Sequence, residues 1–175
     1  MNKERIEEII RVDHAGEHGA TAIYKGTLDI LNLYGDEETK RIIKEMAEGE
    51  KKHVNEFNKL IKDRSIRPTA LLPFWKITGY SLGALSAIYG KQAIMACTEA
   101  VEEVIDKHYS NQIEELEKSG FEKDLLESIK EFHAEEVEHE TIARQEGGEA
   151  SPFISFFKDV VRFGCRGAIK ISEKI

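Results

Sequence analysis

Apolar residues recur at intervals of three and four positions through most of this chain, and that spacing marks one buried face of an α-helix. The pattern predicts helices over about residues 2–34, 37–64, 90–118, 121–146 and 152–173. Gly35 and Gly120 lie in short turns, so that each turn joins an antiparallel pair of helices. The longer segment over about residues 65–89 must then cross from one pair to the other. The pattern therefore predicts an all-α bundle of four long helices, with a long hydrophobic crossover and an extra C-terminal helix.

The composition agrees with one helical domain spanning residues 1–175 and narrows its surroundings. The chain has only three prolines, and its length can bury the core of four packed helices. The net charge of −8 argues against a nucleic-acid partner. Cys97 and Cys165 form no Cys-x-x-Cys motif, so we expect reduced thiols rather than a disulfide. The first residues lead directly into an amphipathic helix, and no targeting peptide is expected there.

Carboxylate and imidazole side chains interrupt four of the predicted apolar faces. The face of the second helix reads Ile43, Met46, Glu50, His53, Phe57 and Leu60, and that of the fourth reads Leu125, Ile129, Phe132, Glu136, His139 and Ala143. The first and third helices carry single carboxylates, Glu17 and Glu102. Glu17 lies 33 residues before Glu50, and Glu102 lies 34 residues before Glu136. The chain thus reads as a repeated helix pair, each half giving one Glu and then one Glu-x-x-His motif.

Buried carboxylates without partners are unfavourable, so these groups must pair with each other or bind a metal ion. One Glu and one Glu-x-x-His from each half form the ligand set of di-iron and di-manganese carboxylate proteins, which are ferritin-like four-helix bundles. We predict six ligands, with Glu50 and Glu136 as bridges between two metal ions: Glu17, Glu50, His53, Glu102, Glu136 and His139. Oxygen and nitrogen ligands without thiolates favour iron or manganese over structural zinc. The competing interpretation is a non-enzymatic bundle whose polar core is satisfied internally.

Several polar residues lie near the six predicted ligands, and the sequence leaves more than one role for some of them. Asp13 either accepts a hydrogen bond from a ligand histidine or caps a separate polar pocket. Tyr109, two turns beyond Glu102, is either a core tyrosine with a satisfied hydroxyl or a catalytic group beside the oxygen-activating face. His14 and His18 are expected to lie away from the metal ions. The glutamates next to the ligands are expected to be solvated or outside the ligand set: Glu99, Glu103, Glu135 and Glu138.

The crossover is unusually apolar for a connecting segment. Lys76 is the only charged residue in the range 71–90, and the uncharged run from Ile77 onward covers 14 residues. That run is too short to span a bilayer as a helix. The crossover therefore either packs against the bundle or a second subunit, or rests in a membrane interface with Trp75 and Tyr80 at the lipid headgroups.

The predicted C-terminal helix differs in charge from the rest of the chain. Basic residues occur at every fourth position: Lys158, Arg162, Arg166 and Lys170. This basic stripe either complements the acidic bundle or attracts anionic lipid.

The segment Arg11-Val12-Asp13-His14-Ala15-Gly16-Glu17 and the two Glu-x-x-His motifs resemble the 5-demethoxyubiquinone hydroxylase family. The resemblance continues through residues 96–103, His108-Tyr109 and 135–139 to the closing segment 164–173, so it covers nearly the whole chain. His18 departs from the family's pattern, in which a tyrosine usually follows the glutamate. Because this position should face away from the metal ions, the departure leaves the predicted ligand set intact.

The resemblance implies a di-iron monooxygenase of ubiquinone biosynthesis whose ligands are the six residues named above. It would use O2 and two electrons from an unidentified donor to hydroxylate the ring of demethoxyubiquinol, a polyprenyl benzoquinol. It would act at a membrane surface, on the cytoplasmic face of a bacterial inner membrane or the matrix side of the mitochondrial inner membrane. A second copy of the chain and other ubiquinone-biosynthesis proteins are the protein partners that the resemblance suggests. A ferroxidase or iron-storage bundle is the alternative enzyme class.

Overall fold

Six helices and no strands make up the computed structural model, which describes residues 1–175. The helices are α1 (Lys3–Tyr34), α2 (Glu37–Asp63), α3 (Leu72–Tyr89), α4 (Lys91–Ser119), α5 (Lys123–Gly147) and α6 (Pro152–Ser172). The all-α prediction is confirmed, and the long helices end close to their predicted ends. Two details differ from the prediction. Helix α5 begins slightly later than Phe121, and most of the crossover is a helix of its own, α3.

Local signals fix where the helices begin and end. The side chains of Asn2, Asp36 and Ser151 each accept a hydrogen bond from the amide three residues further on, at 2.9, 2.8 and 3.3 Å. Each bond satisfies one of the amide groups that the first turn of a helix leaves open. Gly120 closes α4 with φ of 67°, a left-handed conformation that favours glycine. These caps explain why the sequence pattern predicts most helix boundaries.

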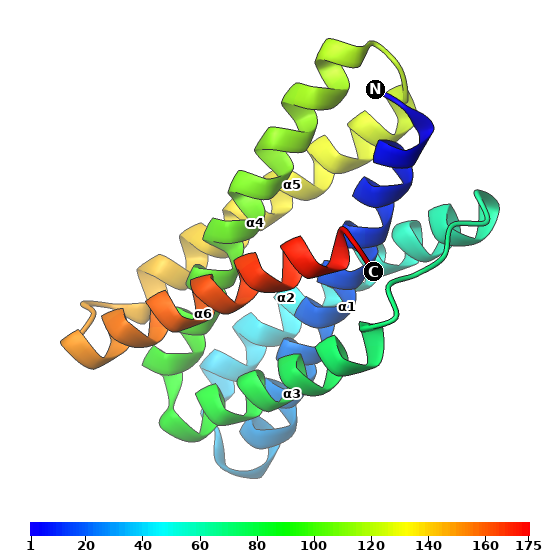
Figure 1. Ribbon diagram of the computed structural model, residues 1–175. Coiled ribbons are helices and arrows are strands. Elements are labelled where there is room, and N and C mark those ends of the chain that lie inside the picture. Colours follow the sequence, from blue (N-terminus) through cyan, green and yellow to red (C-terminus); the bar gives the residue numbers. More distant parts are fainter.

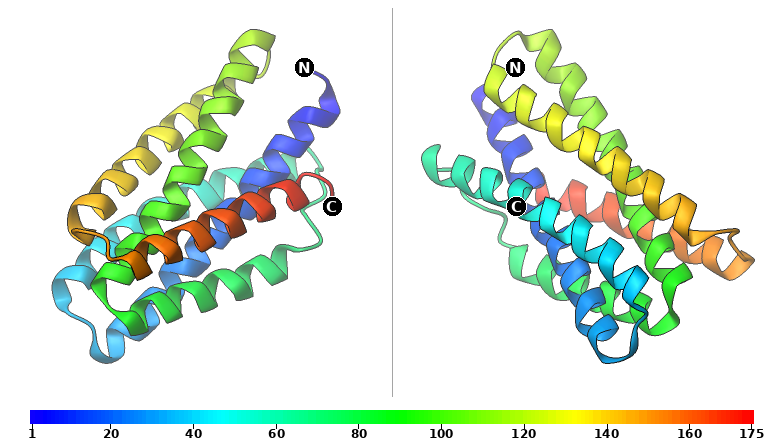
Figure 2. Two further views of the ribbon diagram at one scale, coloured as in Figure 1. Left: turned by 60° about the vertical axis from the view of Figure 1, so that its left-hand side comes forward. Right: turned by 180° about the vertical axis from the view of Figure 1, so that it is seen from behind.

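The helices form three layers (Figures 1 and 2). Helices α1 and α4 form the middle layer, α2 and α5 cover one side of it, and α3 and α6 cover the other. Helices α3 and α6 run antiparallel, because their opposite ends meet in two places. The Trp75 indole N–H donates to Ser172 Oγ at 3.0 Å, and the rings of Tyr89 and Phe153 lie 6.1 Å apart.

Two apolar clusters fill the interior of the bundle. The first contains Ile9, Ile10, Phe57, Ile61, Ile66, Tyr109, Leu116, Leu125, Ile129 and Phe132. The second contains Tyr24, Leu31, Ile42, Ile43, Met46, Ala87, Ile94, Met95 and Ala143. Full burial of one large aliphatic side chain contributes about 1.5–3 kcal/mol, so these clusters dominate the stability of the bundle. The polar residues predicted to bind metal separate the two clusters in sequence on every long helix.

Helix α3 is fixed against α1 by a seam of glycines. A Cβ atom at Gly83 would lie 1.9 Å from the carbonyl oxygen of Ile23, and one at Gly79 would lie 2.7 Å from the carbonyl oxygen of Gly19. Both distances are too short for a side-chain atom, so only glycine allows the two backbones to approach this closely. Thr27 Oγ1 also donates to the Gly83 carbonyl at 3.2 Å. The crossover is therefore packed onto the bundle along its length.

Helix α6 is attached to α4 by ion pairs that use half of the basic stripe. Lys158 Nζ lies 2.7 Å from Glu99 Oε1, and the Arg162 guanidinium donates to Glu103. Arg166 and Lys170 are exposed. The first half of the stripe therefore complements the bundle, and attraction of anionic lipid stays a prediction for the exposed second half. No helix combines the length and the apolar character needed to cross a bilayer.

Candidate metal centre

The six predicted ligands come together at the centre of the four long helices. Two groups of potential ligand atoms form there, with all atoms of a group within 4.8 Å of one another: Glu17, Glu50, His53 and Glu136 in one, and Glu50, Glu102, Glu136 and His139 in the other. All six residues are buried. Glu50 and Glu136 belong to both groups, so these two carboxylates can reach both of two neighbouring ions. This is the sharing predicted for bridges, although bridging itself stays a prediction.

The Glu-x-x-His spacing places each histidine beside a carboxylate of its own helix, because residues three apart lie on one helical face. His53 Nδ1 lies 3.1 Å from Glu136 Oε1, 3.3 Å from Glu17 Oε2 and 3.6 Å from Glu50 Oε2. His139 Nδ1 lies 3.2 Å from Glu136 Oε2 and 3.4 Å from Glu50 Oε1. Both imidazoles therefore turn Nδ1 toward the shared carboxylates.

The electrostatics of the centre are those of a site short of positive charge. Burial and neighbouring carboxylates raise the pKa of Glu17 to about 8 and raise the pKa of Glu102 well above its usual value. Burial also acts to raise the pKa of Glu50, but His139 and His53 beside it lower that pKa to about 2. Burial alone would lower the pKa of His139, yet the carboxylates around it raise the value to about 9. The centre thus contains four carboxylates and only two histidines, so negative charge exceeds the positive charge that the histidines can supply.

Several polar atoms of the centre also lack well-aligned hydrogen bonds within the protein. They are Oε2 of Glu17, both carboxylate oxygens of Glu50 and Nδ1 of His53. Buried polar groups without partners are rare, and each one calls for an explanation. Two divalent cations would stabilise the ionised carboxylates and take up these open ligand atoms. The residues present therefore fit a pair of metal ions with oxygen and nitrogen ligands.

Three further side chains bond to the predicted ligands from outside the set. Glu135 Oε2 lies 2.9 Å from His53 Nε2 and so orients that ring, as carboxylates commonly do for metal-binding histidines. The Tyr109 hydroxyl donates to Glu17 Oε1, and the Tyr24 hydroxyl donates to Glu102 Oε1 at 3.1 Å. The bond of Tyr109 agrees with a core tyrosine whose hydroxyl is satisfied, and a catalytic role for it stays a prediction. The sequence pattern assigned no role to Tyr24.

The remaining polar candidates lie away from the centre. Asp13 Oδ1 accepts a hydrogen bond from Gln112 at 2.8 Å and lies 3.0 Å from His108 Nε2. The prediction that Asp13 accepts a hydrogen bond from a ligand histidine is therefore wrong. Asp13 instead belongs to a separate polar pocket with Gln112 and His108. His14 and His18 both turn Nε2 toward the Asn58 side-chain oxygen, at 3.0 and 3.2 Å, as expected for residues outside the ligand set.

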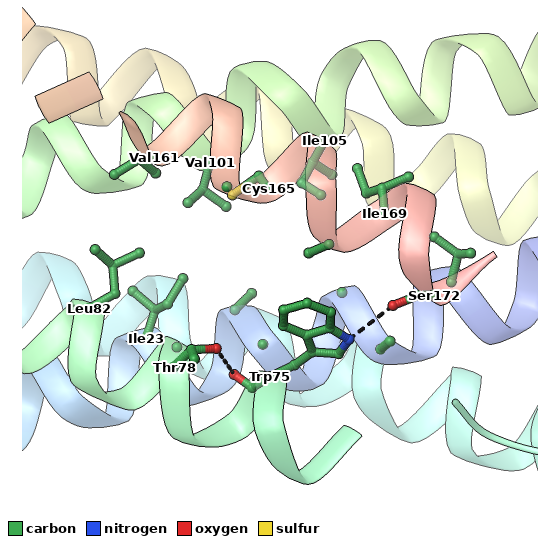
Figure 3. A pocket seen from close by; sticks show the side chains of 18 of the residues that line it. Ile23, Trp75, Thr78, Leu82, Val101, Ile105, Val161, Cys165, Ile169 and Ser172 are labelled. Atoms are coloured by element: carbon green, nitrogen blue, oxygen red, sulfur yellow. Dashed lines mark hydrogen bonds between the residues drawn. The ribbon is translucent and has the colours of Figure 1, made fainter. Parts of the chain in front are cut away.

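An apolar cavity of about 420 Å³ lies between α3 and α6, with α1 and α4 as its floor. Figure 3 shows Ile23 and Leu82 on one side of it and Val101, Ile105 and Val161 on the other. The Trp75 indole points inward, and its bond to Ser172 crosses one end of the cavity (Figure 3). Trp75 is half-buried, with its indole turned toward the cavity. One interpretation of the crossover places Trp75 at the lipid headgroups, and that membrane contact stays a prediction.

A small hollow lies between the cavity and the Glu102 side of the metal centre. Ala20, Ile23 and Val101 line both the cavity and the hollow, and the hollow also touches Tyr24 and Glu102. The hollow is too narrow for a water molecule in this structure. On the side of Glu102, a thin wall of apolar side chains therefore separates the cavity from the centre.

Comparison with known proteins finds one matching family and close relatives. The family model described as "Ubiquinone biosynthesis protein COQ7" matches residues 4–172, from α1 to α6. The mitochondrial NADPH-dependent 3-demethoxyubiquinone 3-hydroxylase of Bos taurus is 44% identical over 177 residues, covering 100% of this chain and 80% of the relative. The 3-demethoxyubiquinol 3-hydroxylase of Rhodospirillum rubrum is 38% identical, covering 97% and 78%. The mitochondrial 5-demethoxyubiquinone hydroxylase of Saccharomyces cerevisiae is 34% identical, also covering 97% and 78%.

Proposed function

Because this chain belongs to the ubiquinone biosynthesis protein COQ7 family, we propose that it hydroxylates the ring of demethoxyubiquinol with O2. The relatives are named as hydroxylases of demethoxyubiquinone or demethoxyubiquinol, which supports a hydroxylating oxidoreductase of ubiquinone biosynthesis. The mitochondrial relative from Bos taurus is named as NADPH-dependent, and we infer NADPH as the electron source here too. The observation that carries the proposal is the buried cluster of four Glu and two His beside an apolar cavity.

The buried cluster would hold two iron ions through Glu17, Glu50, His53, Glu102, Glu136 and His139. The family resemblance favours iron, since the ligand types alone also permit manganese. Iron bound there would supply the oxygen-activating chemistry. The polypeptide contributes the rest: carboxylates that reach both ions, a carboxylate from Glu135 that orients His53, and apolar walls that keep bulk water away.

The cavity would hold the substrate ring and the first part of its isoprenoid tail. Its volume of about 420 Å³ is within the range of small-molecule sites, and most of its lining is apolar. The cavity meets the hollow beside Glu102, so a ring at that end would lie next to the ions. The rest of the tail would leave between α3 and α6, on the side where these helices expose apolar residues.

Anaerobic loading with Fe(II), followed by turnover with demethoxyubiquinol, O2 and NADPH as the electron source, tests the function directly. We expect about two iron ions per chain, as the two ligand groups allow, and one hydroxylated product per substrate consumed. Bulk oxidation of excess Fe(II) without hydroxylation would identify a ferroxidase or iron-storage protein instead. Failure to retain iron or manganese at all would leave a helical bundle with a polar core that is satisfied internally.

We also propose that the protein binds a membrane surface through α3 and α6. Both helices expose large apolar side chains: Phe74, Ile77, Leu85, Ile88 and Tyr89 on α3, and Phe153, Phe156, Val160 and Phe163 on α6. Ile77 is 67% exposed and Phe163 is 80% exposed. Exposed Arg166 and Lys170 lie on the same helix as Phe163 and would contact anionic headgroups. A peripheral position on the bacterial or mitochondrial inner membrane would bring the cavity to a substrate whose polyprenyl tail is confined to the bilayer.

Replacing Ile77 and Phe163 together with glutamate should abolish binding to vesicles that contain anionic lipid. Each change removes an apolar side chain worth about 1.5–3 kcal/mol on burial and adds a charge that the bilayer repels. Vesicle flotation measures the loss, and Val137→Glu is the matched control, since Val137 is 40% exposed on α5 in the opposite layer. Unchanged flotation of the double variant would return this apolar face to the role of a packing or subunit interface.

A further inference from the structure

Tyr24 and Tyr109 occupy equivalent positions in the two halves of the chain. Tyr24 follows Glu17 by seven residues on α1, and Tyr109 follows Glu102 by seven residues on α4. Seven residues are two helical turns, so each tyrosine lies on the same face as the glutamate of its own helix. Both tyrosines are almost completely buried, with 2% and 1% of their surfaces exposed.

Each tyrosine bonds to the glutamate of the other half. The Tyr24 hydroxyl on α1 donates to Glu102 on α4 at 3.1 Å, and the Tyr109 hydroxyl on α4 donates to Glu17 on α1. The acceptor is Oε1 in both cases. The two hydrogen bonds therefore join the middle helices of the bundle reciprocally, on either side of the predicted ions.

These bonds divide the four carboxylates into two kinds. Glu17 and Glu102 belong to one ligand group each, and a tyrosine holds one oxygen of each of them. Glu50 and Glu136 belong to both groups, and no tyrosine bonds to either. Neither oxygen of Glu50 has a hydrogen-bond partner, and Oε2 of Glu136 lies 3.2 Å from His139 Nδ1. A hydroxyl on Oε1 leaves Oε2 as the freer atom for a metal ion, which suits a carboxylate that serves one ion only.

Tyr24 also lies beside a small hollow next to the centre. The hollow that adjoins the cavity touches Tyr24, Glu102 and the Ala20 side chain. The Glu102 carboxylate therefore has neighbouring space on one side and the Tyr24 hydroxyl as its restraint.

On the basis of the proposed metal centre, we infer that Tyr24 is a positioning residue for the ion bound with His139. Its hydroxyl holds Glu102 in the direction of that ion and out of the adjoining hollow. Tyr109 is its counterpart for the ion bound with His53. A purely structural tyrosine would stabilise the fold without any preference between the two ions, so the preference is the property to measure.

Titration of the metal-free protein with Co(II) separates the two ions when one histidine is removed. In a His53→Ala background the group with His139 remains, and there Tyr24→Phe should weaken Co(II) binding about tenfold, as expected for a lost hydrogen bond to a charged group. In a His139→Ala background the group with His53 remains, and the same change should alter the Kd less than about twofold. Tyr109→Phe is the matched control and should show the reverse preference.

A second variant checks that the effect passes through Glu102. Glu102→Asp withdraws the carboxylate from the Tyr24 hydroxyl, so adding Tyr24→Phe to it should cause no further loss of Co(II) affinity in the His53→Ala background. Thermal unfolding of each metal-free variant confirms that it is folded. Equal weakening in both backgrounds, no weakening in either, or additive losses with Glu102→Asp would overturn the inference. Absence of Co(II) binding in all backgrounds and in the unaltered chain would instead reject the metal centre itself.

Discussion

Replacing Glu50 or Glu136 with alanine should release both metal ions and reduce hydroxylation by about a thousandfold or more, because the ions carry the chemistry. Each of these carboxylates belongs to both ligand groups, so one substitution damages both sites. Glu17 and Glu102 belong to one group each, and alanine at either should release one ion more readily than the other. The bundle itself should persist, since the two apolar clusters that dominate its stability contain none of these glutamates.

Iron content after anaerobic loading, measured together with the helical content of each variant, tests this expectation. Glu138→Ala is the matched control, because Glu138 is two residues from Glu136 but is exposed on the outer face of α5. Glu103 is a poorer control, since its carboxylate pairs with Arg162 and Arg144 and helps to attach α6. A full complement of iron in Glu50→Ala, or an equal loss in Glu138→Ala, would contradict the assignment of the buried faces.

Periodicity alone is sufficient to bring the six candidate ligands together. A carboxylate on an apolar stripe must point inward with its neighbours, and four such stripes in a bundle converge on one place. The equivalence of Tyr24 and Tyr109 can also be predicted from the sequence, although the bond from Tyr24 to Glu102 cannot. A comparison of the two halves shows that Tyr24 follows Glu17 at the same seven-residue spacing as Tyr109 follows Glu102.

Other features depend on how helices pack and could not be predicted from the pattern. Helix α3 is apolar on nearly all sides, so periodicity indicates no buried face, and the inward position of Trp75 follows only from its bond to α6. Glu135 lies beside a ligand in sequence and resembles a solvated residue of a helix surface. Its bond to His53 exists because α2 and α5 are neighbours in one layer.

Filling the hollow between the cavity and Glu102 should reduce kcat/KM by about a hundredfold while leaving the ions in place. Ala20 lines both spaces, and a leucine there would fill the hollow beside Glu102. A displacement of the substrate ring by about 1 Å can cost about a hundredfold in rate, so we expect a loss of that order in kcat/KM for Ala20→Leu. Since Ala20 is not one of the six ligands, iron content should match that of the unaltered protein.

Ala168→Leu is the control, because Ala168 lines the same cavity from α6 but does not touch the hollow. The added side chain narrows the cavity equally, yet it lies away from the ions, so kcat should change by less than about threefold and any effect should appear in KM. Equal losses of kcat/KM in both variants would mean that the volume of the cavity, and not the position of Ala20 beside Glu102, governs the reaction. Full activity of Ala20→Leu would mean that the reacting ring does not lie at this end of the cavity. A selective loss at Ala20, with iron retained, would place the reacting ring beside Glu102 and Tyr24.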